Sequence, residues 1–567
     1  MLQLLIIIFN AFIFCHAADS AGTRPNIILI LADNYGFNDV GYHGSERKTL
    51  NLDQLASEAD DYGYNDIGYH GSEIKTPVLD RLAAGGVKLE NYYVQPICSP
   101  TRSQLMTGRY QIHTGIQHSI FWPLQPNGLP LQDPTLADKL RETGYSTHAV
   151  GKWHLGFFKE EYLPTNRGFD TFFGILNGKA DHYQYNDSAM GVNGLDLRDG
   201  IQRVNYEYRG QYSTNLYSKK AVEIVEKHDS EKPLFMYLSF QAVHLPLQVP
   251  EKYLKQYGDI KDMNRKVYAG MTSAMDEAIG DVVKSFESKG LWQDTLLIFT
   301  TDNGGQVLYG GDNWPLRGWK GSLWEGGIKA VGFVHGQMIK KKGTISKELI
   351  HVSDWFPTLI NLADGSLKKT NPLDGVDQWR TISYGEQSQR KTILHNIDPL
   401  MSHVGERKSG KQFDARERAA LRHNEWKIIT GDPGNGSWIY TSTRGQNQNK
   451  LYERPNDKNI WLFNIENDPY EKHDLSTKRP EVVTDLLEML EKFALTSVPC
   501  FYPENDLMAD PKYHEGYWGP WIHAQWITEE VNLPSYTKTF RYSLLSIIIL
   551  VLVCLSLLSI YETKAFT

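Results

Sequence analysis

Three runs of consecutive apolar residues predict the centre of a parallel β-sheet. They are Pro25–Leu31, Leu234–Phe240 and Thr295–Thr301, and each is apolar at successive positions rather than at every second one. A strand that is apolar on both faces is typical of a parallel sheet covered by helices on both sides. Helical patterns over 218–227 and 271–289 lie between these runs. The sequence therefore predicts an open α/β sheet flanked by helices.

Polar side chains follow the three apolar runs. Asp33 comes after the first run, His244 after the second, and Asp302 with Asn303 after the third. Ligands of open α/β sheets bind at the carboxyl ends of the strands. We therefore expect these four side chains to meet at one edge of the sheet.

The pattern changes after about residue 375, where shorter strand-like segments alternate with polar loops. We predict a large domain over 24–375 and a smaller C-terminal α+β domain over 376–530, with a loop-rich insertion at Met401–Asn449. The regular elements expected in the smaller domain are two strands and a helix: Glu425–Thr430, Ile460–Ile465 and Pro480–Phe493.

Both ends of the chain carry apolar segments. Leu2–Phe14 is followed by small residues and predicts a signal peptide over 1–17. The uncharged segment 543–560 is long enough to cross the ~30 Å hydrocarbon core of a bilayer as a helix. A lipid-anchor signal is the alternative, but the charged residues Glu562 and Lys564 that follow favour a transmembrane segment. We expect a chain of the secretory pathway, in the lysosome or membrane-anchored at the cell surface.

Composition excludes some classes of function. The 567 residues are 41% hydrophobic and 22% charged, which is ordinary for a globular protein. The net charge of −8 provides no basic surface for phosphates, so we expect no nucleic-acid partner. Two N-glycosylation sequons, at Asn186 and Asn435, fit exposure in the lumen.

Two of the four cysteines, Cys98 and Cys500, lie outside the apolar terminal segments. Secreted proteins tend to pair their cysteines, so a disulfide between these two is one interpretation. Neither the number nor the spacing of the cysteines indicates a disulfide framework.

An internal repeat covers residues 33–86. The sequence Asp33–Asp39 returns as Asp60–Asp66, and the match continues through GYHGSE in both copies with a constant offset of 27 residues. Two copies are too few for a solenoid. Our hypothesis is that two alternative versions of one exon are both present. Peptide sequencing across 58–61 tests it.

The segment Cys98-Ser99-Pro100-Thr101-Arg102, followed by Thr107-Gly108-Arg109, carries the most specific signal. Alone, such a cysteine would be a small buried apolar residue. Together with HTGIQH, VGKWHLG, NRGFDTFFG, TTDNGG and NWPLRGWKGSLWEGG, it makes the chain resemble the sulfatase family. The resemblance runs from about Pro25 to Trp521 and is closest to the arylsulfatase B-like (N-acetylgalactosamine-4-sulfatase-like) branch. It implies a large domain with the alkaline-phosphatase-like fold.

The resemblance implies covalent catalysis by an oxidised cysteine. Cys98 would be converted to Cα-formylglycine by the formylglycine-generating enzyme, and a hydroxyl of its hydrate would attack sulfur. A sulfate ester needs cationic groups where charge develops. Lys152 and Lys320 match the sulfate-binding lysines of the family.

Three further residues take roles from the resemblance. Arg102 would steady the hydrated aldehyde, and His154 would contact its hydroxyls and act as a base. His244 would protonate the leaving oxygen, which is general acid catalysis.

A divalent cation is implied as well, Ca²⁺ in first place and Mg²⁺ in second, because carboxylate and amide oxygens suit hard cations. The family usually has two aspartates after the first strand. The first copy of the repeat has Asp33-Asn34, and the second has Asp60-Asp61 without a preceding strand. Which copy supplies the ligand stays open. The expected ligands are Asp33, Asn34, Asp61, the oxidised Cys98, Asp302 and Asn303.

The substrate class expected is a sulfated carbohydrate or an aryl sulfate. Two other functions stay open at this stage. A phosphohydrolase of the related fold would need a Ser or Thr nucleophile and ligands for two metal ions. A non-catalytic binding protein with a sulfatase-like cleft would fit the departure at Asn34.

Overall fold

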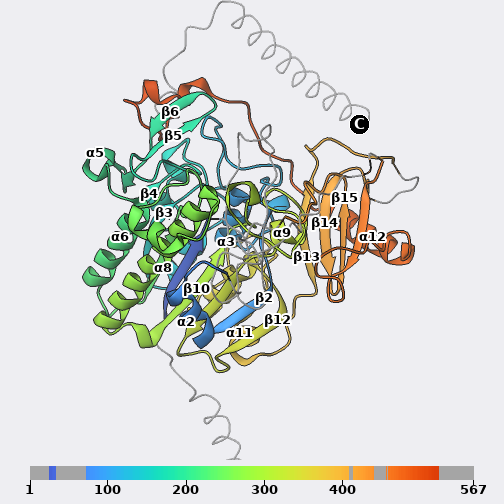
Figure 1. Cartoon of the computed structure of the whole chain (residues 1–567), viewed down its shortest axis with the longest axis horizontal. Coiled ribbons are helices and arrows are strands. Elements are labelled where there is room, and N and C mark those ends of the chain that lie inside the picture. Colours follow the sequence, from blue (N-terminus) through green and yellow to red (C-terminus); the bar gives the residue numbers. More distant parts are fainter. Residues whose placement is uncertain (1–23, 34–71, 408–412, 440–454, 456, 523–567) are drawn as a thin grey trace, which may run out of the picture. The chain divides into compact units, whose positions relative to one another are not determined.

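A ten-stranded sheet organises the chain in this computed structural model (Figure 1). The structure describes residues 24–33, 72–407, 413–439, 455 and 457–522. The predicted signal peptide, nearly all of the first repeat copy and the apolar segment 543–560 lie outside these residues.

The three predicted apolar runs form the centre of this sheet. They correspond to β1 (Asn26–Ala32), β9 (Leu234–Ser239) and β10 (Thr295–Thr301), and β1 pairs in parallel with both others. Every residue of the three strands is buried. The continuous apolar pattern is explained by helices on both faces.

The rest of the sheet is mixed. Its order is β12-β2-β11-β10-β1-β9-β3-β4-β7-β8, in which β11 runs antiparallel to β10 and β2, and β7 and β8 form an antiparallel edge. The remaining strands are β2 (Val87–Tyr93), β3 (Ser146–Lys152), β4 (Thr171–Ile175), β7 (Arg198–Asp199), β8 (Gln202–Arg203), β11 (Gly332–Gly336) and β12 (Thr344–His351).

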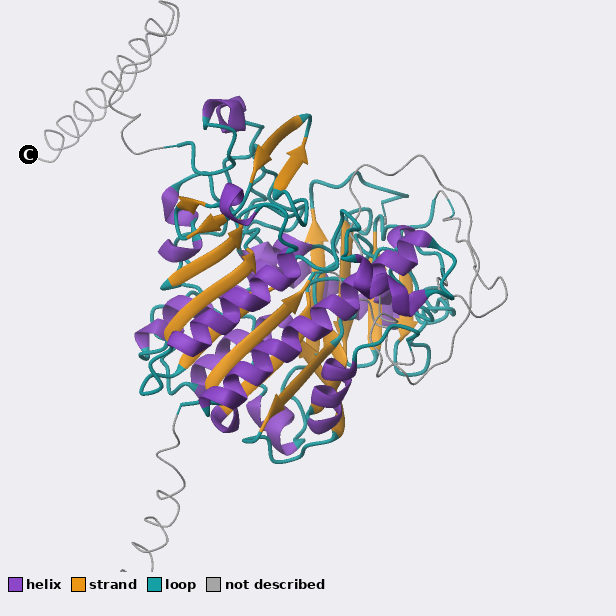
Figure 2. Ribbon diagram, turned by 60° about the vertical axis from the view of Figure 1, so that its left-hand side comes forward, coloured by secondary structure: helices purple, strands orange, loops and turns teal. Residues whose placement is uncertain are grey.

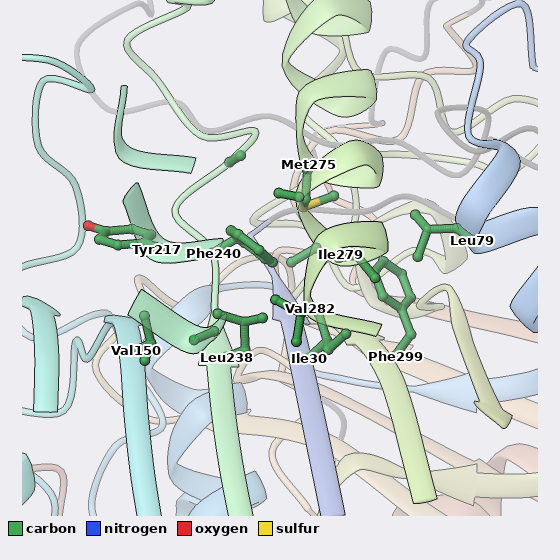
Figure 3. Close-up of a cluster of buried hydrophobic side chains, with 14 of the residues drawn as sticks. Ile30, Leu79, Val150, Tyr217, Leu238, Phe240, Met275, Ile279, Val282 and Phe299 are labelled. Carbon is green, nitrogen blue, oxygen red and sulfur yellow. The ribbon is translucent and has the colours of Figure 1, made fainter. Parts of the chain in front are cut away.

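One face of the sheet is covered by α2 (Pro77–Gly85), α6 (Ser213–Lys227) and α8 (Met263–Lys289). Figure 2 shows the long helices running alongside the strands. In Figure 3, side chains of α8 meet Ile30, Leu238 and Phe299 from three neighbouring strands. Each Å² of apolar surface that these residues bury stabilises the fold by about 25 cal/mol, and this burial is the main stabilising contribution.

The opposite face holds α3 (Cys98–Thr107). Successive side chains of a strand point to opposite faces. Leu238 of β9 packs under α6 and α8, whereas its neighbours Tyr237 and Ser239 bond to Arg102 of α3. The remaining helices are α4 (Leu136–Glu142), α5 (Asn205–Tyr208), α7 (Glu251–Leu254), α9 (Glu325–Ile328), α10 (Trp355–Leu362), α11 (Trp379–Tyr384) and α12 (Pro480–Ala494).

A second sheet, entirely antiparallel, lies within the range predicted for the smaller domain. Its strands are β13 (Thr392–Asp398), β14 (Arg418–His423), β15 (Trp426–Thr430) and β16 (Ile460–Asn464), and α12 packs against it (Figure 1). The expected strands and helix are confirmed. Within the range 401–449, predicted to be rich in loops, the structure adds the strand β14, which was not predicted because the Ala, Leu and Arg of RAALRH favour helix; pairing with β13 and β15 overrides that preference. Among the described residues, β5 (Asn186–Ala189) and β6 (Val192–Leu195) also form a short hairpin.

The described residues up to Trp521 belong to one compact unit. Among the described helices, none combines the length and apolar character needed to cross a membrane. The α/β class with a smaller antiparallel-sheet region is confirmed, and the domain boundaries stay a prediction.

Candidate active site

Cys98 lies at the carboxyl edge of the large sheet, as the first residue of α3. Its side chain is buried, with Sγ 3.7 Å from Asp33 Oδ1 and 3.6 Å from Asn303 Oδ1. Lys320 Nζ donates to Sγ at 3.6 Å.

The aspartates meet because their strands are in register. Ala32 of β1 pairs with Thr301 of β10, so the residues that follow, Asp33 and Asp302, leave the sheet side by side. The segment after β9 joins them, since Val243 N–H donates to the Asp33 carbonyl at 3.2 Å. The expected meeting of polar residues at this edge is confirmed.

Oxygen and sulfur atoms suited to a cation gather here. Ligand atoms of Asp33, Cys98 and Asp302 all lie within 4.8 Å of one another, and Asn303 adds its amide oxygen beside the sulfur. All are buried. Two carboxylates and an amide oxygen form a donor set that fits a hard divalent cation.

Arg102 is held by a network that reaches both aspartates. It lies four residues after Cys98 on α3, hence on the same face of the helix. Its guanidinium donates twice to Asp302 Oδ2, at 3.1 and 2.9 Å, and its Nη2 lies 3.7 Å from Asp33 Oδ2. A further bond of 2.7 Å goes to Ser239 Oγ. This fully buried cation offsets the negative charge of the paired carboxylates.

Burial and mutual repulsion separate the acidities of these groups. Burial and the charge of Asp302 raise the pKa of Asp33. Burial acts in the same direction on Asp302, but the charges of Arg102 and Lys152 hold the pKa of that carboxyl below its usual value. Burial, reinforced by Asp302, raises the pKa of the Cys98 thiol to about 12. An unmodified thiol here is neutral at physiological pH and a weak nucleophile.

The two lysines reach the same place from different segments. Lys152 ends β3, and its ammonium group forms a buried ion pair with Asp33. Lys320 lies in the loop before α9, where its backbone N–H donates to Gly305 O at 3.2 Å. Both predicted sulfate-binding lysines therefore border the Cys98 site.

The two histidines are also buried at this edge. His154 has a φ of 56°, a conformation that costs energy in a residue with a side chain and often marks functional sites. Its Nε2 lies 3.3 Å from Phe121 O, and its Nδ1 has no hydrogen-bond partner among the described residues. His244 bonds through Nδ1 to Leu245 O at 2.8 Å. Burial, followed by the charge of Lys152, lowers the pKa of both imidazoles well below the usual value.

Sequence reasoning missed the residues that support this shell. Ser239 accepts from Arg102, and His182 Nε2 bonds to the backbone oxygen of His244 at 3.1 Å. Ser239 is the last residue of β9, so its position at the carboxyl end of a central strand could have indicated a place in the site. His182 lies in a loop that is distant from His244 in the sequence, and no sequence pattern indicated its contact.

The downstream Thr-Gly-Arg of the motif serves the fold. Gly108 ends α3 with φ 68°, and a Cβ there would lie 2.8 Å from Cβ of Phe356. Arg109 forms an ion pair of 2.7 Å with the buried Asp133. The helix that begins with Cys98 is thereby fixed at its other end.

Several sequence predictions fall elsewhere. Asn34 and Asp61, the alternative metal ligands, lie outside the described residues. The cysteines Cys98 and Cys500 are both free thiols, so the disulfide interpretation is wrong. An unbridged Cys98 is what oxidation to formylglycine requires.

Comparisons with known proteins agree with this geometry. The profile of the sulfatase family matches residues 25–366. Mouse (Mus musculus) arylsulfatase J is 51% identical over 522 residues, covering 90% of this chain and 82% of the relative. Human (Homo sapiens) N-acetylgalactosamine-6-sulfatase is 27% identical over 408 residues, covering 68% of this chain and 71% of the relative.

Solved structures give the same result. The crystal structure of Ps i-CgsB in complex with k-i-k-neocarrahexaose superposes with a TM-score of 0.67 and 28% identity, covering 87% of this chain and 98% of that chain. The family profile spans more than half of the sequence and includes Asp33, Cys98, Asp302 and Lys320. This chain belongs to the sulfatase family and is a sulfuric ester hydrolase.

Proposed function

We propose that this sulfatase hydrolyses sulfate esters of glycans or aryl alcohols with a nucleophile made by oxidation of Cys98 to formylglycine. The observation that carries the proposal is the position of Cys98 Sγ, in contact with Asp33, Asn303 and Lys320 at once. A buried thiol with a pKa near 12 is protonated at physiological pH, so the unmodified side chain would be a weak nucleophile among these groups. A hydrated aldehyde would supply the attacking oxygen that the thiol lacks.

A single divalent cation, Ca²⁺ in first place, would be held by Asp33, Asp302 and Asn303 together with residue 98. A further ligand would come from Asn34 or Asp61. When bound, the cation would stabilise negative charge on oxygen as a Lewis acid. The donor set supports this assignment, because ligand atoms of Asp33, Cys98 and Asp302 lie within 4.8 Å of one another and carboxylate oxygens suit a hard cation.

The surrounding cations of the chain would bind and orient the substrate. Lys320 contacts Cys98 Sγ and Lys152 pairs with the neighbouring Asp33, so both would carry positive charge close to a sulfate group bound at residue 98. Such preorganised charges in a buried site are the usual source of large rate enhancements. Arg102 would keep Asp302 ionised and in place.

The histidines would handle protons. Burial keeps His154 and His244 neutral in the resting site. A bound sulfate ester brings negative charge, which raises the pKa of nearby imidazoles. His244 could then take up a proton and donate it to the leaving oxygen, while His154 would serve as the base.

The proposed compartment and substrate class follow from separate arguments. The predicted signal peptide and segment 543–560 support a protein of the secretory pathway, membrane-anchored with a lumenal catalytic unit. The oligosaccharide in the complex of Ps i-CgsB supports a sulfated glycan as the physiological substrate.

Hydrolysis of an aryl sulfate by protein co-produced with formylglycine-generating enzyme tests the proposal. Cys98→Ala is expected to lose turnover, and the matched control Cys500→Ala, at the other free thiol, is expected to keep it. Full activity of Cys98→Ala would refute the nucleophile. Absence of turnover despite an oxidised residue 98 would favour the non-catalytic binding protein, and turnover of phosphate esters alone would favour a phosphohydrolase.

A further inference from the structure

One of the two glycosylation sequons lies on a turn that packs against the loop of Lys320. We call residues 432–438 the Asn435 turn and residues 317–324 the Lys320 loop. Four hydrogen bonds join them: Leu323 N to Pro433 O at 2.8 Å, Arg317 Nε to Gly436 O at 2.9 Å, Gly318 N to Ser437 O at 3.0 Å and Trp324 Nε1 to Gly434 O at 3.2 Å.

The other side of the Lys320 loop contacts the catalytic segment. Gly321 N–H donates to Pro96 O at 2.8 Å, two residues before Cys98, and Lys320 Nζ reaches Cys98 Sγ. The loop is therefore a single layer between the nucleophile segment and the Asn435 turn. Its partly exposed residues are Trp319, Lys320 and Gly321, of which Lys320 contacts Cys98.

The Asn435 side chain is exposed and arranged so that its amide nitrogen is available. Its Oδ1 accepts the Ser437 N–H at 2.9 Å, which fixes the side chain in a local turn. Among the described residues, Nδ2 of Asn435 makes no hydrogen bond. The preceding residue, Gly434, packs closely on the Lys320 loop: a Cβ added to Gly434 would lie 3.0 Å from Cα of Ser322. The absence of a side chain at Gly434 therefore lets the turn pack against the loop.

The second sequon has a different environment. Asn186 is half-buried in β5, and its Nδ2 donates to Asn193 Oδ1 at 3.3 Å across the hairpin. A glycan on Asn186 would compete with that bond. The geometry therefore favours Asn435 over Asn186.

We propose that Asn435 carries an N-linked glycan at the rim of the active site, where it hinders extended sulfated chains but not small sulfate esters. In the transfer, Nδ2 of Asn435 would bond to the anomeric carbon of a lipid-diphosphate-linked oligosaccharide, lose one proton and release the lipid diphosphate. The glycosylation requires that the chain enters the lumen of the secretory pathway, and its effect on the binding of sulfated chains rests on the sulfatase function proposed above. A glycan is bulky and solvated, and it stays outside the packed layers.

The experiment uses full-length protein from a eukaryotic secretory host, with Asn435→Gln as the variant and Asn186→Gln as the matched control. Peptide mass spectrometry before and after glycosidase treatment reads occupancy at each asparagine. Inhibition of aryl sulfate hydrolysis is measured with two probes, inorganic sulfate and long chondroitin sulfate chains.

We expect a glycan on Asn435 in the wild-type protein. Asn435→Gln should lower the inhibition constant of the long chains several-fold and leave that of inorganic sulfate unchanged, whereas Asn186→Gln should change neither. An unmodified Asn435 peptide, or an unchanged inhibition constant for the chains, would overturn the proposal. Loss of all aryl sulfate activity in the wild type would refute the proposed function instead, and the mass of the peptide would still report the glycan.

Discussion

Replacement of Lys427 by Met should destabilise the protein strongly, because this lysine is the centre of a buried charge triad. Its Nζ lies 2.9 Å from Glu325 Oε1 and 2.8 Å from Glu471 Oε1, and all three side chains are fully buried. Glu325 begins α9, directly after the Lys320 loop, while Lys427 belongs to β15 of the smaller sheet. The triad therefore connects the loop at the active site to the second sheet.

The magnitude follows from what Lys427→Met would leave behind. Met fills a similar volume without charge, so Glu325 and Glu471 would face each other with no cation between them. Removing one partner of a buried ion pair costs about 3–5 kcal/mol, against a total stability of about 5–15 kcal/mol. Lys458 offers a matched control, since its ion pair with Asp474 is partly exposed. Lys458→Met should cost about 1 kcal/mol or less.

Urea unfolding of the two variants and the wild type gives the comparison. The deficit of Lys427→Met should grow with rising pH. Burial already raises the pKa of Glu471 to about 7, and, against the effect of burial, the charge of Lys427 holds the pKa of Glu325 below its usual value. Loss of the lysine should raise both pKa values, and carboxyl groups with a raised pKa favour the folded state only while protonated. Replacing Glu325 and Glu471 by Gln in the same variant should recover most of the loss. A deficit for Lys427→Met no larger than that for Lys458→Met, or one that does not depend on pH, would refute the reasoning.

Three further predictions concern the cation, the repeat and a buried carboxyl group. Chelation of divalent cations should abolish aryl sulfate hydrolysis, and added Ca²⁺ should restore it. The variant Asp302→Ala should not recover at the same Ca²⁺ concentration. Activity that persists after chelation would contradict the metal assignment. Deletion of residues 34–60 joins Asp33 to Asp61 and restores the two consecutive aspartates of the family. Calorimetry should therefore show that the deletion variant binds Ca²⁺ more tightly than the wild type. Equal or weaker binding would count against Asp61 as the natural ligand. Burial raises the pKa of Asp276 from 3.8 to about 7, so its contribution to stability is complete below the lower value and is lost as pH rises through the upper one. The stability of Asp276→Asn should therefore fall less than that of the wild type over this interval, and parallel stability curves would contradict the assignment.

The centre of the large sheet could be predicted, because its three central strands are continuous apolar runs between helices, whereas the other seven strands were not predicted. The same logic brought Asp33 and Asp302 together, since residues that follow paired parallel strands must be neighbours. The strand β14 was missed because its residues favour helix, and only pairing with β13 and β15 makes it a strand. Local sequence carries no record of such pairing.

The site was predictable where motifs carry it and not where distant loops meet. Cys98 and Arg102 were identified through their shared motif, and the structure places them on one face of α3. Lys320 was identified only through the resemblance, because its contact with Cys98 depends on a loop held by Pro96 and by the turn at Asn435, which are far apart in the sequence. The hydrogen bond between His182 and the backbone oxygen of His244 likewise joins loops that are distant in the sequence.

The most direct test of the account is the mass of the peptide that contains Cys98, from active protein made in a secretory host. We predict a residue that has lost its sulfur and gained one oxygen, with an aldehyde that a hydrazide reagent captures. The extent of capture should rise in proportion to the aryl sulfate activity across preparations. An unmodified thiol at position 98 in fully active protein would contradict the central claim.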